Sequence, residues 1–165
     1  MELLAVVVIL TVISAFAVPP IRALRANIRE HRAEAQMGLM IEAIKQMKDR
    51  NGVWMALSEV DDDYPGGHVA RFNPAENKDI LYATVCNEFY ATGIPVRRRQ
   101  DVNELGFSDL FACGYLRPKD FKDSPYTFSF FQDVRGDYCT DRGKPGWCLD
   151  MCSETGCITT LIQQD

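Results

Sequence analysis

The N-terminal stretch MELLAVVVILTVISAFAVPP, residues 1–20, decides how the rest of the chain is interpreted. From Leu3 to Val18 it has no ionisable side chain, and a helix needs roughly 20 apolar residues to cross a hydrocarbon layer about 30 Å thick. The sequence therefore predicts a helix that can enter a membrane. Glu2 stands at its start, where a cleavable signal peptide would carry basic residues. Burying that carboxylate is costly unless a cation meets it.

Beyond Pro19 and Pro20 the apolar residues recur at helical spacing. They are Ile21, Leu24 and Ile28, followed by Met37, Met40, Ile44 and Met47. This stripe predicts an amphipathic continuation of the first helix, which we expect to end near Asn51 and Gly52 because both residue types readily adopt the left-handed conformation.

A basic ridge accompanies the apolar stripe. Its members, at intervals of three, four and three, are Arg22, Arg25, Arg29 and Arg32. The ridge is either a surface that faces water or lipid headgroups, or one that pairs with acidic patches on neighbouring subunits. Arginines beside a membrane helix are typical of the cytoplasmic side, whereas the cysteines favour the opposite side, and a leader segment preceding this sequence would reconcile the two.

Composition and charge favour one apolar segment and one folded domain of about 110 residues. The chain has 165 residues, of which 47% are hydrophobic and 25% charged. The formal net charge is −5, and the acidic excess falls downstream of Gly52. A nucleic-acid-binding domain would have the opposite sign, so we predict no nucleic-acid partner.

All six cysteines lie far downstream of the apolar segment: Cys86, Cys113, Cys139, Cys148, Cys152 and Cys157. An even number behind a membrane-directing segment indicates an oxidising compartment and disulfides. A zinc site built from the last four thiolates is the alternative, but their spacing lacks the two-residue knuckle of structural zinc sites.

The N-terminal region resembles type IV pilins and the pseudopilins of type II secretion systems. Glu2-Leu3-Leu4, the apolar run, Pro19, and a long helix that ends in Lys48-Asp49-Arg50-Asn51-Gly52 carry the resemblance. Glu2 corresponds to the N-terminal glutamate of that family, and Pro19 to its helix-kinking proline. Members usually begin a few residues earlier, with a methylated Phe or Met after a leader peptide. Thr11 replaces a common Gly, and Pro20 is an additional proline.

The resemblance implies an assembly role for this region. Glu2 would meet the N-terminal amine of the preceding subunit, and Pro19 and Pro20 would let the helix bend or stretch as the subunit leaves the membrane. The resemblance also implies a prepilin peptidase and an inner-membrane assembly machinery as partners. The helix core of the filament would contain Leu3, Leu4, Val7, Leu10 and Phe16.

The remainder of the chain is expected to form an α+β head with an antiparallel sheet packed on the second half of the helix. Asn73-Pro74-Ala75-Glu76 resembles a capping box, and Leu81, Val85 and Phe89 form a stripe that predicts a helix ending at Gly93. A shorter helix is predicted from Ser108 to Gly114. Three strands are predicted, at 126–130, 147–152 and 157–162.

Strand geometry constrains the disulfides. Within one strand Cys148 and Cys152 lie about 13 Å apart, whereas a disulfide needs Cα atoms within about 7 Å. These two cysteines therefore cannot pair with each other. Among the fifteen possible arrangements we prefer Cys152 with Cys157 across the turn at 153–156, Cys139 with Cys148 around the Gly/Pro loop, and Cys86 with Cys113 between helices.

Catalytic motifs are not evident in the sequence. His31 and His68 are far apart, and we find no nucleophile elbow, phosphate loop or HExxH. Asp61, Asp62 and Asp63 are expected to form a solvated loop, with calcium binding as the alternative. Arg135-Gly136-Asp137 matches an adhesion tripeptide but is interpreted as a tight turn. Arg97, Arg98 and Arg99 are interpreted as exposed charge, with contact to the acidic loop of a neighbouring subunit as the alternative.

These observations predict a non-enzymatic structural subunit without a cofactor or metal. Its expected segments are a filament-core helix at 1–20, an amphipathic continuation at 21–52, a connecting region with short helices at 53–125, and a disulfide-braced sheet at 126–165. We expect a subunit that leaves the inner membrane to form an extracellular homopolymer. The alternatives are a periplasmic pseudopilin, a minor or tip pilin, and a permanently membrane-anchored enzyme or receptor.

Overall fold

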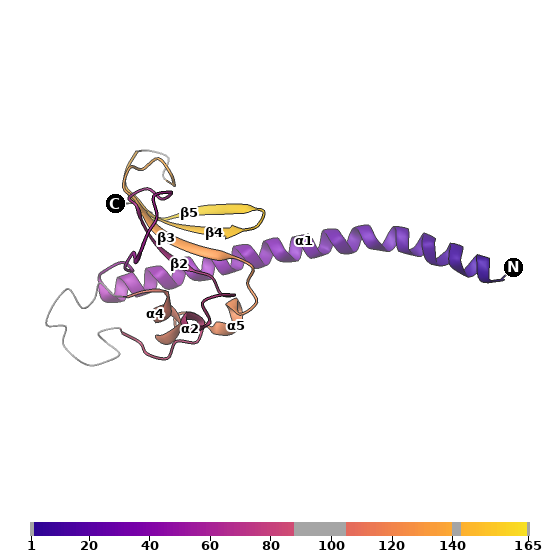
Figure 1. Ribbon diagram of the computed structural model, residues 1–165, viewed down its shortest axis with the longest axis horizontal. Coiled ribbons are helices and arrows are strands. Elements are labelled where there is room, and N and C mark those ends of the chain that lie inside the picture. Colours follow the sequence, from indigo (N-terminus) through magenta and orange to yellow (C-terminus); the bar gives the residue numbers. More distant parts are fainter. Residues whose placement is uncertain (1, 88–104, 140–142, 165) are drawn as a thin grey trace. The chain divides into compact units, whose positions relative to one another are not determined.

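The computed structural model describes residues 2–87, 105–139 and 143–164, and leaves out the side chains of residues 2–5, 9–27 and 29. The chain divides into two compact units, Met1–Ala35 and Gln36–Asp165. The first unit is the N-terminal part of helix α1 (Glu2–Asn51). The second unit, here called the head, contains the end of α1 and all other elements (Figure 1).

Helix α1 runs without interruption through Pro19 and Pro20. Each proline removes one backbone donor from the helix, but the helical path continues on both sides. The predicted end is confirmed, because α1 stops at Asn51 and Gly52 follows with a φ of 75°. The amide of Gly52 donates to the carbonyl of Lys48 at 2.7 Å, which satisfies one of the last helix acceptors.

The predicted apolar stripe is confirmed within the head. Met37, Met40, Ile44 and Met47 are all buried. Gln36 is buried beside them, and its amide is satisfied in both directions, since Nε2 donates to the carbonyl of Asp120 at 2.6 Å and Oε1 accepts from Ser124 Oγ at 2.8 Å. In the first unit Ile28 is 58% exposed, while the side chains of Ile21 and Leu24 lie outside the description.

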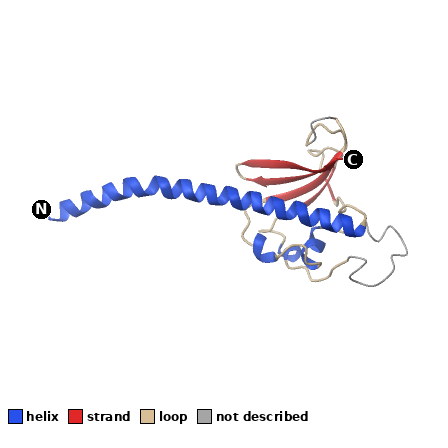
Figure 2. Cartoon of the chain, turned by 180° about the vertical axis from the view of Figure 1, so that it is seen from behind, coloured by secondary structure: helices blue, strands red, loops and turns tan. Residues whose placement is uncertain are grey.

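The head contains a five-stranded antiparallel sheet whose strands follow one another in chain order (Figure 2). They are β1 (Glu59–Val60), β2 (His68–Phe72), β3 (Thr127–Asp133), β4 (Gly146–Ser153) and β5 (Gly156–Gln164). The last three strands confirm the prediction. The first two were not predicted, and they lie within 53–125, the segment expected to be a connecting region with short helices.

Strand β3 is buried on both faces of the sheet. Successive side chains alternate between faces, so Phe128 and Phe130 lie on one face and Phe131 on the other, yet each is 0% exposed. On the Phe130 face, Trp147 stacks on Phe130 with ring centroids 5.2 Å apart, and the ring of Trp54 lies tilted to Phe130 at 5.9 Å. The Phe131 face carries its own cluster, considered below.

Three short helices complete the described head: α2 (Lys78–Leu81), α4 (Phe107–Ala112) and α5 (Pro118–Phe121). The predicted helix at 108–114 corresponds to α4. The aromatic rings of Phe111 and Phe121 meet edge to face, with centroids 5.7 Å apart. These helices bury phenylalanines beside Phe72 and Phe128 and extend the core.

The helix predicted from Pro74 to Gly93 is wrong over the residues that can be compared. Asn73 Oδ1 accepts from the amide of Ala75 at 3.1 Å, and Asn77 Oδ1 accepts from the amide of Asn73 at 2.9 Å, so the segment closes into a turn instead of a helix. Helix begins only at Lys78 and ends at Leu81. Val85 is 71% exposed, whereas Phe89 and Gly93 lie outside the described residues.

The three preferred disulfides are confirmed. Cys86 pairs with Cys113, Cys139 with Cys148, and Cys152 with Cys157. No cysteine is free. The last bridge joins directly opposed residues of β4 and β5.

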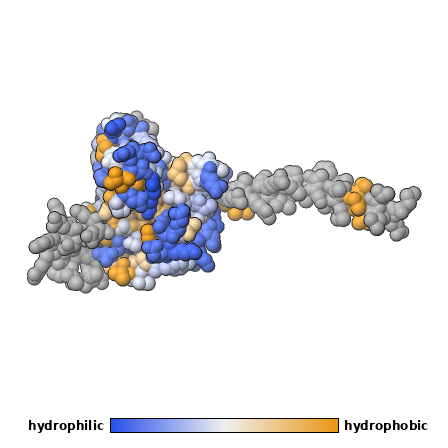
Figure 3. Space-filling model, viewed as in Figure 1, coloured by the Kyte–Doolittle hydropathy of each residue, from blue (hydrophilic) through white to orange (hydrophobic). Residues whose placement is uncertain are grey.

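The surface of the head in view is dominated by hydrophilic residues, with small hydrophobic spots between them (Figure 3). Among the described residues, no helix is long and apolar enough to span a membrane.

Candidate functional site

A pocket of about 480 Å³ lies between the β1–β2 loop and the start of the β3–β4 loop. The side chains that matter for its chemistry are Asp62, Asp63, Tyr64, Arg135, Asp137 and Tyr138. Both loops cover the Phe131 face, because the rings of Tyr64 and Tyr138 lie with their centroids 4.7 and 5.2 Å from that of Phe131. Val69 and Cys148 are buried in the same cluster.

The β1–β2 loop is held by its own hydrogen bonds. The amide of Asp61 donates to the carbonyl of Gly67 at 3.1 Å, and the amide of Gly67 donates to the carbonyl of Tyr64 at 2.9 Å. Asp61 also accepts from the amide of Asp63 and forms an ion pair with Arg71. The bond from the Asp63 amide and the pairing with Arg71 keep the pKa of Asp61 below its usual value, despite the opposing effect of burial.

Arg71 stabilises this wall of the pocket by a second contact. Its guanidinium carbon lies 5.6 Å from the centre of the Tyr64 ring, within the range of a cation–π interaction. Partial burial opposes the charge, but the hydrogen bonds to Asp61 and Tyr64 prevail and raise the pKa of Arg71. The guanidinium of Arg71, in β2, is thus held between a carboxylate and a tyrosine of this loop.

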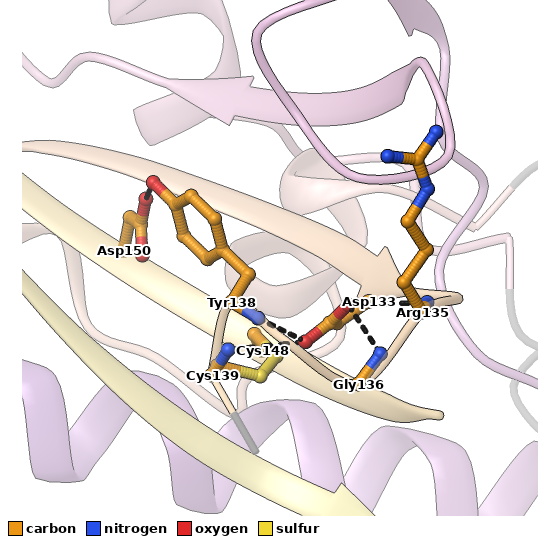
Figure 4. The surroundings of a disulfide bond; sticks show 7 residues. All are labelled: Asp133, Arg135, Gly136, Tyr138, Cys139, Cys148 and Asp150. Atoms are coloured by element: carbon orange, nitrogen blue, oxygen red, sulfur yellow. Dashed lines mark hydrogen bonds between the residues drawn. A yellow bond between two sulfur atoms is a disulfide. The ribbon is translucent and has the colours of Figure 1, made fainter. Parts of the chain in front are cut away.

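The β3–β4 loop folds around one carboxylate, that of Asp133 (Figure 4). This side chain is 0% exposed. It accepts backbone hydrogen bonds at 3.3, 2.8, 2.9 and 3.0 Å; the donors are Arg135, Gly136, Tyr138 and Cys139. Burial alone would raise the pKa of Asp133, but these donors outweigh it and hold that pKa below its usual value.

The tripeptide Arg135-Gly136-Asp137 forms part of this turn, as predicted. Gly136 has a φ of 71°, and a Cβ atom there would collide with the backbone of Gly143 and Lys144. The amide of Gly143 donates to the carbonyl of Gly136 at 3.0 Å. The turn therefore requires glycine, both for its conformation and for the close approach of the returning chain.

A second buried carboxylate, Asp150, lies under the same loop. It is 1% exposed, its Oδ2 accepts from the hydroxyl of Tyr138 at 3.3 Å (Figure 4), and its Oδ1 has no hydrogen-bond partner among the described residues. Desolvation raises the pKa of Asp150, and hydrogen bonds from Thr159 and Tyr138 offset this only in part. Burial and the proximity of Asp150 likewise raise the pKa of Tyr138.

The mouth of the pocket is acidic. Asp62, Asp63 and Asp137 are exposed and, within the described part of the chain, none of their carboxylates forms an ion pair or accepts a hydrogen bond. The guanidinium of Arg135 extends away from Asp133 in Figure 4. Three carboxylates against one guanidinium give the pocket a net negative charge.

The cluster of Asp133, Cys139 and Cys148 has the composition of a metal site, with one possible ligand atom from each residue within 4.8 Å of the others. Both sulfur atoms, however, belong to the same disulfide. The carboxylate is occupied by backbone donors. The structure therefore favours a covalent brace over the zinc alternative considered from the sequence.

Most predicted assembly residues lie where the structure describes no side chains; these are Glu2, Leu3, Leu4, Leu10, Phe16, Pro19 and Pro20. Val7 of the same set is 49% exposed. Arg97, Arg98 and Arg99 lie outside the described residues. His31 is exposed with Nδ1 3.5 Å from Glu34 Oε2. His68 begins β2 as an exposed residue and is not among the described residues that line the pocket.

Asp133, Asp150 and Gln36 were not singled out from the sequence. A signal existed for Asp133, because an aspartate that ends an apolar strand just before a glycine turn is well placed to accept backbone amides. Asp150 gave a signal of another kind, as a lone charge inside the apolar segment WCLDM.

A scan against protein-family models gave no match, and searches of curated proteins and of solved structures gave no significant match either.

Proposed function

We propose that the protein is a structural subunit that polymerises through its N-terminal helix into a type IV pilus-like filament. The observation that carries the proposal is Glu2 at the start of an apolar run, inside one helix that extends to Asn51. A carboxylate in that position discriminates between registers when helices bundle, since an unpaired buried charge costs several kcal/mol.

Exposure of apolar side chains in the first unit supports this function. Val6, Val7 and Val8 are 56%, 49% and 56% exposed, and Ile28 is 58% exposed. Exposing neighbouring apolar side chains to water is energetically unfavourable, so such a group is expected to be covered by another apolar surface. Lipid before assembly and neighbouring copies of the helix after assembly would provide that cover.

The head agrees with a role at the outer surface of such a filament. Three disulfides and the mostly hydrophilic face of the head seen in Figure 3 suit an oxidising, aqueous environment. In this proposal the second half of α1 packs against the sheet, as the resemblance implies. The buried methionines support this arrangement, while the two hydrogen bonds of Gln36 join the helix to α5 and the segment that follows it.

The proposal is tested by electron cryo-microscopy of fibres sheared from cells that produce the protein at its native level. We expect long fibres whose density matches this chain, with a bundle of N-terminal helices at the centre. Protein that stays in the cell envelope without fibres would contradict the proposal and favour the pseudopilin or the anchored protein.

The role of Glu2 is tested in the same cells by Glu2→Gln. We expect at least a tenfold loss of fibres at an unchanged amount of protein, because the charge that selects the register is gone. Glu42→Gln is the matched control, since Glu42 is an exposed residue of the same helix. Equal fibre yield from the two variants would show that Glu2 has no specific role in assembly.

A further inference from the structure

The acidic pocket between the two loops has features of a preformed site. Its walls are fixed independently of any ligand, by the Asp61–Gly67 hydrogen bonds on one side and by the amides gathered around Asp133 on the other. The Cys139–Cys148 disulfide fastens the second wall to β4. Because these loops are already ordered, binding in the pocket carries no additional entropy cost for ordering them.

The chemistry of the pocket favours a cationic group. The three carboxylates at its mouth lack partners within the described residues, and two tyrosine rings form its apolar walls. Charge and aromatic surface together are the environment in which guanidinium groups bind. Arg71 demonstrates this next door, since it contacts both Asp61 and the ring of Tyr64.

A source of guanidinium groups lies in the same sequence. Residues 20–35 contain four arginines and two glutamates, and helix α1 is continuous through this segment. At about 1.5 Å per residue the arginines span about 15 Å of helix along one face. This spacing would allow one arginine to reach the pocket and the next to face its acidic mouth.

We propose that this pocket receives an arginine side chain from the segment 20–35 of another copy of the chain. The inference rests on the proposed self-assembly, and it adds a specific contact between the head of one copy and the helix of the next. Complementary charge is the argument for this partner: a basic ridge and a net-negative pocket occur in one polypeptide that repeats itself in a polymer.

The test uses the full-length oxidised protein in detergent, and a fluorescent peptide of residues 20–35. We expect saturable binding by fluorescence anisotropy that weakens with salt. A peptide with its four arginines replaced by glutamine is expected to bind at least tenfold more weakly. Free arginine amide is expected to compete only at far higher concentration, and equal affinity for arginine amide would overturn the proposal in favour of a small-molecule site.

The pocket is tested by the triple variant Asp62→Asn, Asp63→Asn and Asp137→Asn, which we expect to weaken peptide binding at least tenfold. Its matched control removes three exposed carboxylates elsewhere on the head, those of Glu76, Asp123 and Glu154. The control is expected to bind like the wild type. Equal affinity of the two triple variants would overturn the proposal.

Failure of this inference is distinguishable from failure of the proposed function. Fibres that form normally from the pocket variant, together with pocket-independent peptide binding, would refute the helix–pocket contact and leave the filament subunit in place. Pocket-dependent peptide binding in a chain that forms no fibres would refute the filament and support the contact itself.

Discussion

Two regions of the Phe131 face each bury an aspartate, and the surroundings of the two side chains differ. Asp133 and Asp150 are 0% and 1% exposed. The pKa of Asp133 is nevertheless held below its usual value while that of Asp150 is raised above it. Two carboxylates on one face of one sheet are therefore equally hidden from solvent, yet their pKa values shift in opposite directions.

The difference follows from where each residue lies in its strand. Asp133 is the last residue of β3, where the chain turns and its amides are no longer needed for the sheet. Asp150 lies in the middle of β4 and is paired on both sides, with Ser129 and with Thr159. Because backbone amides in a central strand donate to the neighbouring strands, Asp150 must rely on side chains.

The largest effect is expected from removing the carboxylate that organises the loop. Asp133→Ala leaves four backbone donors without their acceptor, so we expect a loss of about 3 kcal/mol in the free energy of unfolding. The measurement is denaturant unfolding of the oxidised protein. Asp133→Asn keeps one acceptor oxygen and is expected to lose less.

Asp137→Ala is the control for this comparison. Asp137 belongs to the same loop but is exposed, and we expect a change within about 0.5 kcal/mol. If Asp133→Ala were no more destabilising than Asp137→Ala, the loop would not depend on the buried carboxylate.

Replacing Asp150 is expected to change the free energy of unfolding in the opposite direction, by stabilising the protein. Its folded-state pKa lies above the reference of 3.8, so between these two values the folded chain binds more protons than the unfolded chain. Stability therefore falls as pH rises through this window. Asp150→Asn removes the buried charge, and we expect a gain of about 1 to 2 kcal/mol at neutral pH that vanishes near pH 3.8.

The same pH titration sharpens the comparison with Asp133. Its folded-state pKa lies below 3.8, so its contribution is present above that pH and is lost as pH falls through the folded-state value. Thermal unfolding of Asp133→Asn should therefore approach that of the wild type in acid. Parallel pH profiles for the two asparagine variants would contradict the assignment of opposite shifts.

The smallest effect is expected from Tyr138→Phe. The change removes the hydroxyl that donates to Asp150 and keeps the ring against Phe131, so we expect a loss of about 0.5 to 1 kcal/mol. It should also raise the pKa of Asp150 further, which carboxyl NMR measures. Tyr82→Phe is the control at an exposed position, and an unchanged Asp150 pKa in Tyr138→Phe would exclude the hydrogen bond.

Features governed by neighbouring residues were predictable from the sequence. The methionine stripe of α1, its end at Asn51, and strands β3 to β5 follow from local periodicity and turn residues. Strand geometry excluded one disulfide pairing, since a straight strand keeps Cys148 and Cys152 apart, and the three pairs were a preference among the arrangements that remained.

Features governed by distant contacts were not predictable. Strand β2 buries both Val69 and Ala70, because its two faces are covered by different parts of the chain, so it lacks the alternation that marks a strand. The failed helix after Pro74 has a similar cause. The Cys86–Cys113 bridge and the bond from the Asn87 amide to Asp109 tie that segment to α4, and tertiary contacts override its helical pattern.

The candidate site divides in the same way. The acidic residues Asp62 and Asp63 and the tripeptide at 135–137 were noted as separate surface features. Only the fold shows that they line one pocket, because register between β2 and β3 brings their loops together. No local pattern reports that two loops more than 60 residues apart, at about Asp63 and Arg135, share a face.

The placement of the disulfides also determines how the polypeptide responds to mechanical tension. The bridges close loops with sequence separations of 27, 9 and 5 residues. A stretched chain gains about 3.5 Å per residue, so these closed loops withhold about 145 Å of contour length from a pulling force. The segments between Gly52 and Cys86 and between Cys113 and Cys139 lie outside these closed loops, and there the oxidised head can lengthen without breaking a covalent bond.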